Sequence, residues 1–283
     1  MRLAAEVAGE GAPVVLLHGL TATRRYVVMG SRALERAGHR VVAYDARGHG
    51  RSEPAGERRA YGYEQLAGDL LAVLDRLELE RALLAGVSMG AHTALALALR
   101  APRRVAALVL ITPGYDPARH GRPQPGQSGE TGQSDGGDGG EGGAFAAWDA
   151  LAHGLREGGV EGFLAASDTE RLPERWRETV RRAIRQRLAA HAHPGAVADA
   201  LEAVPRSRPF AEMAALERIA VPAVVVGSRD EADPSHPLEL ARAYARSIPG
   251  ARLLVEGEGR PPIAWQGAQI SRVIAAARRA GGD

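Results

Sequence analysis

The chain has 283 residues, of which 45% are hydrophobic and 25% charged, a globular balance that suffices for one large domain or two small ones. Its formal net charge of +2 at pH 7 argues against a nucleic-acid binder, which usually carries a clustered basic excess. The absence of cysteine excludes disulfides, thiolate metal ligands and a cysteine nucleophile, and no apolar run reaches the ~18 residues of a membrane span.

The predicted elements alternate along the chain between short apolar strands and longer amphipathic helices. Strands are predicted at residues 14–17, 41–44, 82–85, 105–111, 223–226 and 253–255, and helices at residues 27–37, 63–77, 89–99, 237–247 and 270–277. The strands are apolar on both faces, which is typical of a parallel sheet covered by helices on both sides. We therefore expect an α/β fold with a doubly wound, mostly parallel sheet.

This alternation is interrupted in the middle of the chain. We expect residues 1–113 and 210–283 to form the core and residues 114–209 to form an inserted helical cap. The first part of the insertion, residues 121–143, consists of Gly, Ser, Gln and Asp with almost no apolar residue, a composition that predicts disorder. The second part, residues 171–191, carries an apolar stripe that predicts a helix packed on the core rather than an anion-binding surface. The stripe consists of Trp176, Val180, Ala183, Ile184 and Leu188.

The strongest motif is Gly86-Val87-Ser88-Met89-Gly90, which follows a predicted strand and precedes a predicted helix. This is the context that a G-x-S-x-G nucleophile elbow requires. The turn is tight, so small residues must flank the serine, and the helix N-terminus favours negative charge that develops beside it. The motif predicts Ser88 as a nucleophile.

Two upstream motifs agree with this interpretation. His18-Gly19-Leu20 follows the first strand, and residues 45–52, with the sequence DARGHGRS, follow the second. With the elbow, these motifs resemble the α/β-hydrolase superfamily over about residues 12–113 and 214–280. The resemblance implies that the N–H groups of Leu20 and Met89 form an oxyanion hole and that His18 and Gly19 line the site. Arg47 and His49 are interpreted as scaffold of the second motif.

The resemblance also implies a triad acid in the loop after residues 223–226. In relatives the acid usually follows the strand-ending glycine by three residues, which here selects Asp230. Asp233 is the alternative. The carboxylate that is not the acid is expected to cap the next helix or to be solvated.

The position of the base departs from the family pattern. Relatives carry a histidine after the last strand, where this chain has Arg260. Arginine stays protonated and cannot accept the serine proton, although we expect Arg260 to line the site near Asp230 and Ser88. His236 is the base candidate, because it lies six residues after Asp230 at a helix N-terminus that would keep its imidazole neutral. We expect His92 to be a core residue.

The insertion supplies further histidines, one of which a cap could bring to Ser88. They are His120, His153, His191 and His193. The pair His191 and His193 has no third ligand indicated, so no metal site is expected. The sequence predicts no cofactor.

The motifs favour an enzyme of the carboxylesterase type, a serine hydrolase acting on a small carboxylic ester or related acyl compound. One alternative is a ligand-binding protein without turnover, in which Arg260 pairs with Asp230 or clamps an anionic ligand beside Ser88. Another is a non-hydrolytic enzyme on the same fold, since fold alone does not determine the reaction. The expected partner is a small molecule, with no nucleic acid and no membrane. Residues 1–11 lack a signal-peptide pattern, so we expect a cytoplasmic protein of undetermined oligomeric state.

Overall fold

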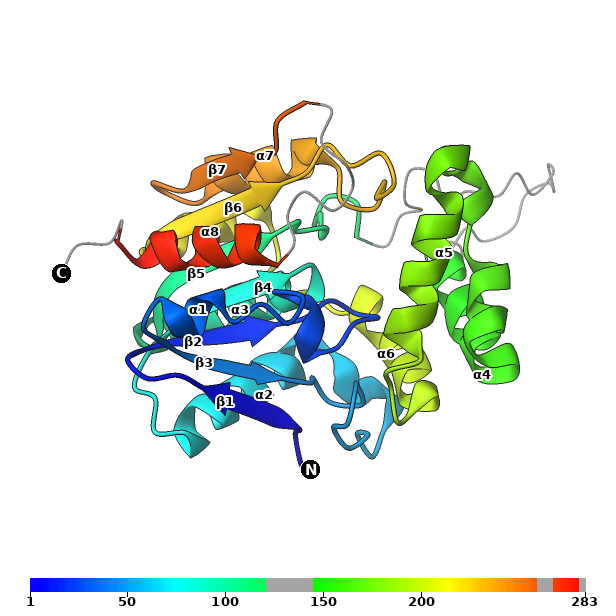
Figure 1. Cartoon of the computed structure of the whole chain (residues 1–283), viewed down its shortest axis with the longest axis horizontal. Helices are drawn as coiled ribbons and strands as arrows, with labels where there is room; N and C mark the ends of the chain where they lie inside the picture. Colours follow the sequence, from blue (N-terminus) through cyan, green and yellow to red (C-terminus); the bar gives the residue numbers. More distant parts are fainter. Residues whose placement is uncertain (121–144, 259–266, 280–283) are drawn as a thin grey trace.

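The computed structural model describes residues 1–120, 145–258 and 267–279. A seven-stranded sheet with the order β1-β3-β2-β4-β5-β6-β7 forms its centre (Figure 1). The strands are β1 (Ala5–Ala8), β2 (Ala12–Leu17), β3 (His39–Tyr44), β4 (Ala82–Val87), β5 (Val105–Ile111), β6 (Ala223–Gly227) and β7 (Arg252–Val255). Only β1 pairs antiparallel, along β3, so the predicted mostly parallel sheet is confirmed. The edge strand β1 was not predicted, because its short and largely exposed sequence lacks the apolar run of a buried strand.

Helices cover both faces of the sheet, as a doubly wound fold requires. The helices α1 (Ala33–Arg36) and α8 (Ala268–Arg279) pack with Val14 and Leu16 on one face. The helices α2 (Tyr63–Arg76), α3 (Met89–Arg100) and α7 (Leu238–Ser247) pack with Val15 and Leu17 on the other. Alternate β2 residues thus point into two separate apolar cores, because strand side chains alternate between faces.

The predicted helix at residues 27–37 is wrong. Only α1 and the 3-10 turn η1 (Arg24–Tyr26) are helical in this region. Met29 and Gly30 adopt φ angles of 48° and 71°, in the left-handed region that ends a right-handed helix. The remaining 3-10 turns are η2 (Arg58–Tyr61), η3 (Pro102–Arg104), η4 (Thr169–Arg171) and η5 (Met213–Arg218).

Three helices, which we call the cap helices, lie between β5 and β6 in the chain and beyond the carboxyl ends of the strands (Figure 1). They are α4 (Ala146–Ala166), interrupted at Gly159, α5 (Glu174–Leu188) and α6 (Pro194–Arg206). The helix predicted at residues 171–191 corresponds to α5. The disorder predicted for residues 121–143 and the position of Arg260 lie outside the described residues.

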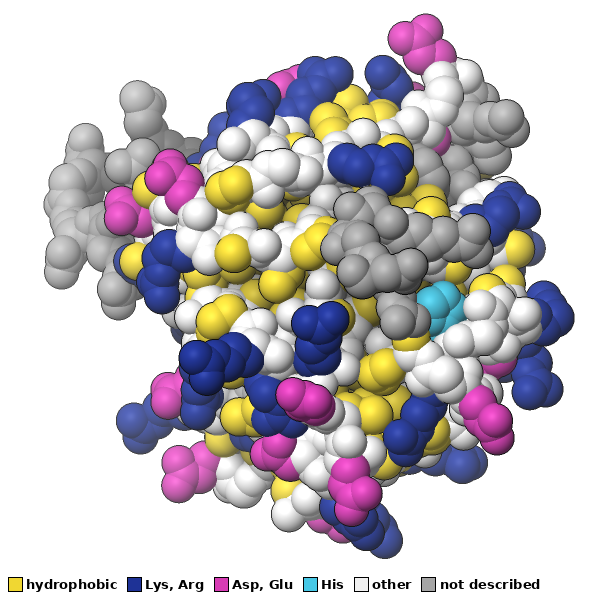
Figure 2. Space-filling model, turned by 90° about the vertical axis from the view of Figure 1, so that its left-hand side faces the viewer, with side chains coloured by type: hydrophobic (Ala, Val, Ile, Leu, Met, Phe, Trp, Pro, Cys, Tyr) yellow, Lys and Arg dark blue, Asp and Glu magenta, His cyan; other side chains and the backbone are white. Residues whose placement is uncertain are grey.

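The cap helices have their own apolar contacts and also touch the core. Leu188 of α5 packs with Val197 and Leu201 of α6, while the other side of α6 packs against Met89 and Tyr61. In the part of the chain that the structure describes, no helix combines the length and apolar character needed to cross a membrane. Figure 2, viewed from the side away from the cap helices, shows acidic and basic side chains intermingled at the surface.

Candidate active site

Ser88 lies in the turn between β4 and α3, at the carboxyl edge of the parallel sheet. Its φ of 49° and ψ of −111° are strained for a residue with a side chain, at a typical cost of about 1–3 kcal/mol. The Ser88 N–H donates to the carbonyl of Ile111 on β5 at 3.0 Å. The neighbouring sheet strand thereby holds the strained turn in place.

Two glycines make this turn possible. A Cβ atom on Gly86 would lie 2.2 Å from the carbonyl carbon of Gly90, and one on Gly90 would lie 2.2 Å from the carbonyl oxygen of Leu17. Side chains at either position would collide with backbone, which has little room to move. The small residues of the elbow motif are therefore required by the approach of α3 to β2 and β4.

Ser88, His236 and Asp233 form a continuous hydrogen-bonded chain. The Ser88 hydroxyl lies 2.8 Å from Nε2 of His236, and Nδ1 of His236 lies 2.8 Å from both carboxylate oxygens of Asp233. The Ser235 hydroxyl also donates to Asp233, at 2.8 Å. With the proton on Nδ1, His236 donates to Asp233 and its Nε2 accepts the hydroxyl hydrogen of Ser88.

The electrostatics of this pair suit a base. Desolvation alone would lower the pKa of His236, but the charge and hydrogen bond of Asp233 outweigh it and raise the pKa above 6.5. Desolvation would raise the pKa of Asp233, yet the paired His236 brings it to about 2. Asp233 is therefore ionised at neutral pH. The helix N-terminus was expected to keep His236 neutral, but the adjacent carboxylate acts in the opposite direction.

Asp230, which the spacing rule selected as the acid, is not in contact with His236. Its carboxylate accepts a hydrogen bond from the N–H of Ala232 at 2.8 Å and so shapes the turn that leads to Asp233. Burial, with Asp233 and Glu256 nearby, raises the pKa of Asp230. The alternative carboxylate, Asp233, occupies the place beside the imidazole because it shares a single turn with His236, whose N–H donates to the Asp233 carbonyl.

The loop after β2 presents a backbone N–H beside Ser88. The carbonyl of Gly19 accepts hydrogen bonds from Nδ1–H of His18 at 2.8 Å and from the N–H of Ala22 at 3.0 Å. In a trans peptide the N–H points away from the carbonyl, so the N–H of Leu20 points away from His18. A Cβ atom on Gly19 would lie 3.8 Å from that of Ser88, which places this peptide at the site.

His18 is held in the tautomer that this arrangement needs. Its Nε2 accepts a hydrogen bond from the N–H of Ala46 at 2.9 Å, so its proton lies on Nδ1. Burial, together with His49, lowers the pKa of His18 well below the ordinary value. The N–H of Met89 lies at the first turn of α3, where helical N–H groups have no intrahelical acceptor. Leu20, in the loop beside Ser88, and Met89, at the start of α3, thus remain the candidates for the two oxyanion-hole donors.

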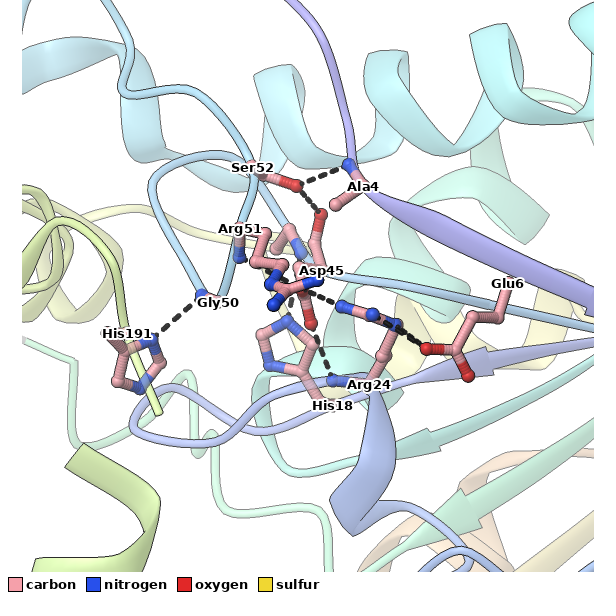
Figure 3. A network of polar contacts seen from close by, with 10 residues as sticks. Ala4, Glu6, His18, Arg24, Asp45, Gly50, Arg51, Ser52 and His191 are labelled. Carbon is pink, nitrogen blue, oxygen red and sulfur yellow. Dashed lines mark hydrogen bonds and ion pairs between the residues drawn. The ribbon is translucent and has the colours of Figure 1, made fainter. Parts of the chain in front are cut away.

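A polar network fastens the loop after β3 to the loop after β2 (Figure 3). The buried carboxylate of Asp45 accepts hydrogen bonds from the N–H of Arg24 at 2.8 Å and of Arg51 at 3.0 Å, and it pairs with the Arg24 guanidinium. His49 lies between the two loops, with Nδ1 2.9 Å from the carbonyl of Arg47 and Nε2 2.6 Å from that of Leu20, and its neutral ring donates its one N–H to one of these carbonyls. These contacts position the loop that carries Leu20.

Arg47 contacts α2. Its guanidinium pairs with Asp69 at 2.7 Å. Its role in the described structure is therefore to join the loop after β3 to a helix.

His92 is buried, as expected, but it also supports the site. Its Nε2 accepts hydrogen bonds from the N–H groups of Gly114 and Tyr115, both at 3.1 Å, and its Nδ1–H donates to the hydroxyl of Tyr63. A Cβ on Gly114 would lie 2.8 Å from the ring of His236. Burial lowers the pKa of His92 to about 3, so the ring stays neutral. His92 thus secures the loop against which His236 rests.

The histidines of the insertion do not lie against Ser88 in the described structure. His191 accepts from the N–H of Gly50 at 2.8 Å and donates to the carbonyl of Thr21 at 3.2 Å. Both of its nitrogens are therefore occupied. His153 and His193 are exposed, and the ring of His120 packs between Tyr115 and Phe145. Among the described residues, no cluster of three or more metal-ligating side chains occurs.

Arg187, in the last turn of α5, belongs to the site although the sequence analysis did not single it out. Its charge acts on Asp233 and His236, and its Nε is buried. The helical spacing alone indicates that Arg187 lies near the core, because Arg187 follows Ala183 by four residues and Ile184 by three. It therefore lies beside the apolar stripe that faces the core.

Comparison with known proteins defines the family. The model of the alpha/beta hydrolase fold matches residues 12–268, and the chain belongs to this family. A 2-hydroxy-6-oxononadienedioate/2-hydroxy-6-oxononatrienedioate hydrolase from Pseudomonas putida is 43% identical over 121 residues, which are 41% of this chain and 42% of that protein. Epoxide hydrolase B from Mycobacterium tuberculosis is 40% identical over 103 residues, 36% of this chain and 29% of that protein. The chain spans less than half the length of these curated relatives.

Solved structures agree over nearly the whole chain. A thermophilic esterase from Thermogutta terrifontis superimposes with a TM-score of 0.72 at 28% identity, over 98% of this chain and 92% of that one. The enol-lactonase from Burkholderia xenovorans LB400 has a TM-score of 0.69 at 24% identity, over 98% and 94% of the two chains. The similarity to the enol-lactonase supports a shared fold.

Proposed function

We propose that the protein is a serine hydrolase that cleaves a carboxylic ester or related acyl compound. Ser88 is the nucleophile, His236 the general base and Asp233 the carboxylate that orients it. The N–H groups of Leu20 and Met89 form the oxyanion hole. The observation that carries this proposal is the contact of 2.8 Å between the Ser88 hydroxyl and Nε2 of His236, whose Nδ1 faces Asp233.

In the first half-reaction, the Ser88 oxygen attacks the ester carbonyl and His236 takes the hydroxyl proton at Nε2. The carbonyl oxygen becomes an oxyanion, which the two N–H groups stabilise. Such donors are typically worth about 3–4 kcal/mol each of barrier. His236 then protonates the leaving alcohol as the ester C–O bond breaks, leaving an acyl group on Ser88.

In the second half-reaction, water attacks the acyl carbonyl while His236 takes one of its protons. The bond to the Ser88 oxygen breaks, and the same proton returns to that oxygen as the carboxylic acid leaves. Asp233 stabilises the imidazolium in both halves. It keeps the proton of the resting base on Nδ1.

The esterase from Thermogutta terrifontis supports acyl chemistry for this fold, and it is similar along nearly the full chain. The ligand-binding alternative was motivated by the arginine at position 260, where relatives carry a base. His236 supplies a base candidate from a different loop, which removes that motive.

The test is covalent labelling with a fluorophosphonate probe, together with hydrolysis of 4-nitrophenyl butyrate. We expect labelling of the wild type and none of Ser88→Ala, and a loss of kcat on the order of a thousandfold in His236→Ala. The matched control is His153→Ala, which removes an exposed histidine of α4. A wild type that neither labels nor hydrolyses the ester would favour the ligand-binding protein, and labelling without hydrolysis of any ester would favour a different reaction.

A further inference from the structure

Arg187 is a partly buried cation that the described residues leave without a partner. Its Nε is buried and has no hydrogen-bond partner, and none of the described ion pairs includes its guanidinium. Burial lowers its pKa. A buried guanidinium N–H without a hydrogen-bond acceptor is costly inside a protein, so such a side chain is expected to meet an acceptor, preferably an anionic one.

The other arginines of α5 contrast with Arg187. Four of them form ion pairs, Arg175 with Glu231, Arg177 and Arg181 with Glu170, and Arg185 with Glu161. Arg182 is exposed to solvent. Only Arg187, among the described residues of α5, combines burial at Nε with the lack of a partner.

The charge of Arg187 acts on the catalytic groups. The charged or polar groups that act on it are the carboxylate of Asp233 and the hydroxyl of Tyr26, both on the core. It acts in turn on Asp233 and on His236. A side chain of a cap helix thus places a positive charge beside the hydrogen-bonded chain that ends at Ser88.

The end of α5 is fixed over the site. His191, four residues after Arg187 and just beyond the end of α5, binds the Gly50 N–H and the Thr21 carbonyl, and the Ala192 N–H donates to the Gly50 carbonyl at 2.8 Å. Figure 3 shows the contact between His191 and Gly50. Thr21 follows Leu20 directly, so the cap helix is fastened to the loop of the oxyanion hole. Arg187 is therefore held in place by the fold.

The carboxylate of Asp233 stabilises the charge of Arg187, but none of the described hydrogen bonds or ion pairs joins the two side chains. Both oxygens of Asp233 lie 2.8 Å from His236, and one also accepts from Ser235. Asp230 and Glu256 add negative charge around the same loop. These carboxylates would repel a dianion such as phosphate, whereas one guanidinium matches one carboxylate, with which it can form paired hydrogen bonds.

We propose that Arg187 binds a carboxylate of the substrate, so that the preferred substrates are esters bearing a second, negatively charged carboxylate group. The inference rests on the proposed ester hydrolysis and names its substrate class. A hemi-ester of a dicarboxylic acid carries this group on the acyl side, and an ester of a hydroxy acid carries it on the alcohol side.

The experiment compares two esters of equal shape that differ in charge. Mono-4-nitrophenyl adipate ends in a carboxylate, and 4-nitrophenyl 6-methylheptanoate ends in an isopropyl group. We expect the ratio of kcat/KM for the charged to the neutral ester to fall at least about tenfold in Arg187→Met, mainly through KM, because a hydrogen bond to a charged group is lost. Arg187→Lys should restore part of the ratio, and the exposed control Arg182→Met should leave it unchanged.

A second pair, butyryloxyacetate and isobutyl butyrate, repeats the comparison with the carboxylate on the alcohol side, and a fall in either pair supports the proposal. An unchanged ratio in both pairs overturns it. Equal losses on charged and neutral esters also overturn it and show that Arg187 serves only the Asp233–His236 pair or the cap.

A binding measurement separates failure of this inference from failure of the proposed function. Adipate should bind Ser88→Ala by calorimetry, and adding Arg187→Met should weaken that binding at least about tenfold. Hydrolysis of the neutral esters, with no adipate binding and an unchanged ratio in both ester pairs, overturns the inference alone. Adipate binding without hydrolysis of any ester overturns the proposed function and leaves the anion site standing.

Discussion

At the scale of single residues, Asp233 and His236 lie three positions apart in one loop, so a single turn of backbone positions both the proposed acid and the proposed base. Asp233→Asn tests this assignment. We expect kcat to fall about a thousandfold or more, because an amide cannot stabilise the imidazolium and favours the wrong tautomer. Asp230→Asn should cost far less, since the carboxylate of Asp230 accepts its hydrogen bond from the backbone N–H of Ala232 and not from His236. Both variants are compared by steady-state kinetics on 4-nitrophenyl butyrate. A larger loss of kcat in Asp230→Asn than in Asp233→Asn would identify Asp230 as the acid.

The pH dependence of the reaction follows from the same pair. His236 must be neutral to accept the serine proton, and Asp233 raises its pKa above 6.5. Activity therefore falls as pH drops through that raised pKa. In Asp233→Asn the pKa of His236 should be lower, so the residual activity should begin to fall only at a lower pH than in the wild type. Profiles of kcat/KM from about pH 5 to about pH 9 measure this shift, and a fall in activity at the same acidic pH in wild type and variant would contradict the prediction.

At the scale of elements, the elbow depends on close approach of α3 to β2. Gly90→Ala should lower the free energy of unfolding by at least about 2 kcal/mol, because its Cβ would lie 2.2 Å from the backbone of Leu17. Gly68→Ala is the matched control, since a Cβ there, in the middle of α2, meets nothing within 4 Å. It should stabilise by about 0.5–1 kcal/mol. Urea unfolding of both variants measures the contrast, and similar values for the two would show that the turn can relax.

His191 adds two side-chain hydrogen bonds to the attachment of the cap to the core. His191→Ala would leave the Gly50 N–H and the Thr21 carbonyl without their side-chain partner. We expect a loss of about 1–3 kcal/mol in unfolding free energy. Activity should fall as well, because Thr21 adjoins Leu20. Unchanged stability and activity together would indicate that α6 alone holds the cap.

At the scale of the whole molecule, buried neutral histidines set the response to acid. Burial lowers the folded-state pKa of His18, His49, His92 and His191 below 6.5. The unfolded chain therefore binds more protons than the folded chain below about pH 6.5, and stability falls as pH falls.

The expected loss between about pH 7.5 and about pH 5.5 is about 1 kcal/mol for each fully neutral histidine. His236 has the opposite sign, because its raised pKa favours the folded state at low pH. The stabilisation from His236 at low pH is smaller than the combined destabilisation from the four buried neutral histidines. Urea unfolding at both pH values is the measurement, and His92→Phe should reduce the difference. Equal stability at both pH values would show that these histidines are protonated in the folded protein.

Much of the fold follows from local pattern. Five of the predicted helices have counterparts, and the apolar runs at residues 14–17 and 105–111 are strands, because burial on both faces demands apolar side chains. The helix at residues 27–37 failed where two residues adopt positive φ, a conformation that hydrophobic periodicity does not encode. The strand β1 was not predicted, because its residues form no buried apolar run and its extended conformation depends on hydrogen bonding to β3.

For the site, the sequence by itself determined the candidates, since Ser88, Leu20 and Met89 are fixed to strand ends by short motifs whose geometry is local. Which carboxylate faces His236, and whether His236 reaches Ser88 at all, depended on the path of a loop between β6 and α7 relative to α3. The charge of Arg187 was visible in the sequence, but its burial beside Asp233 was not. Contacts between residues far apart in the chain arise from packing of whole elements, and only the tertiary structure decides them.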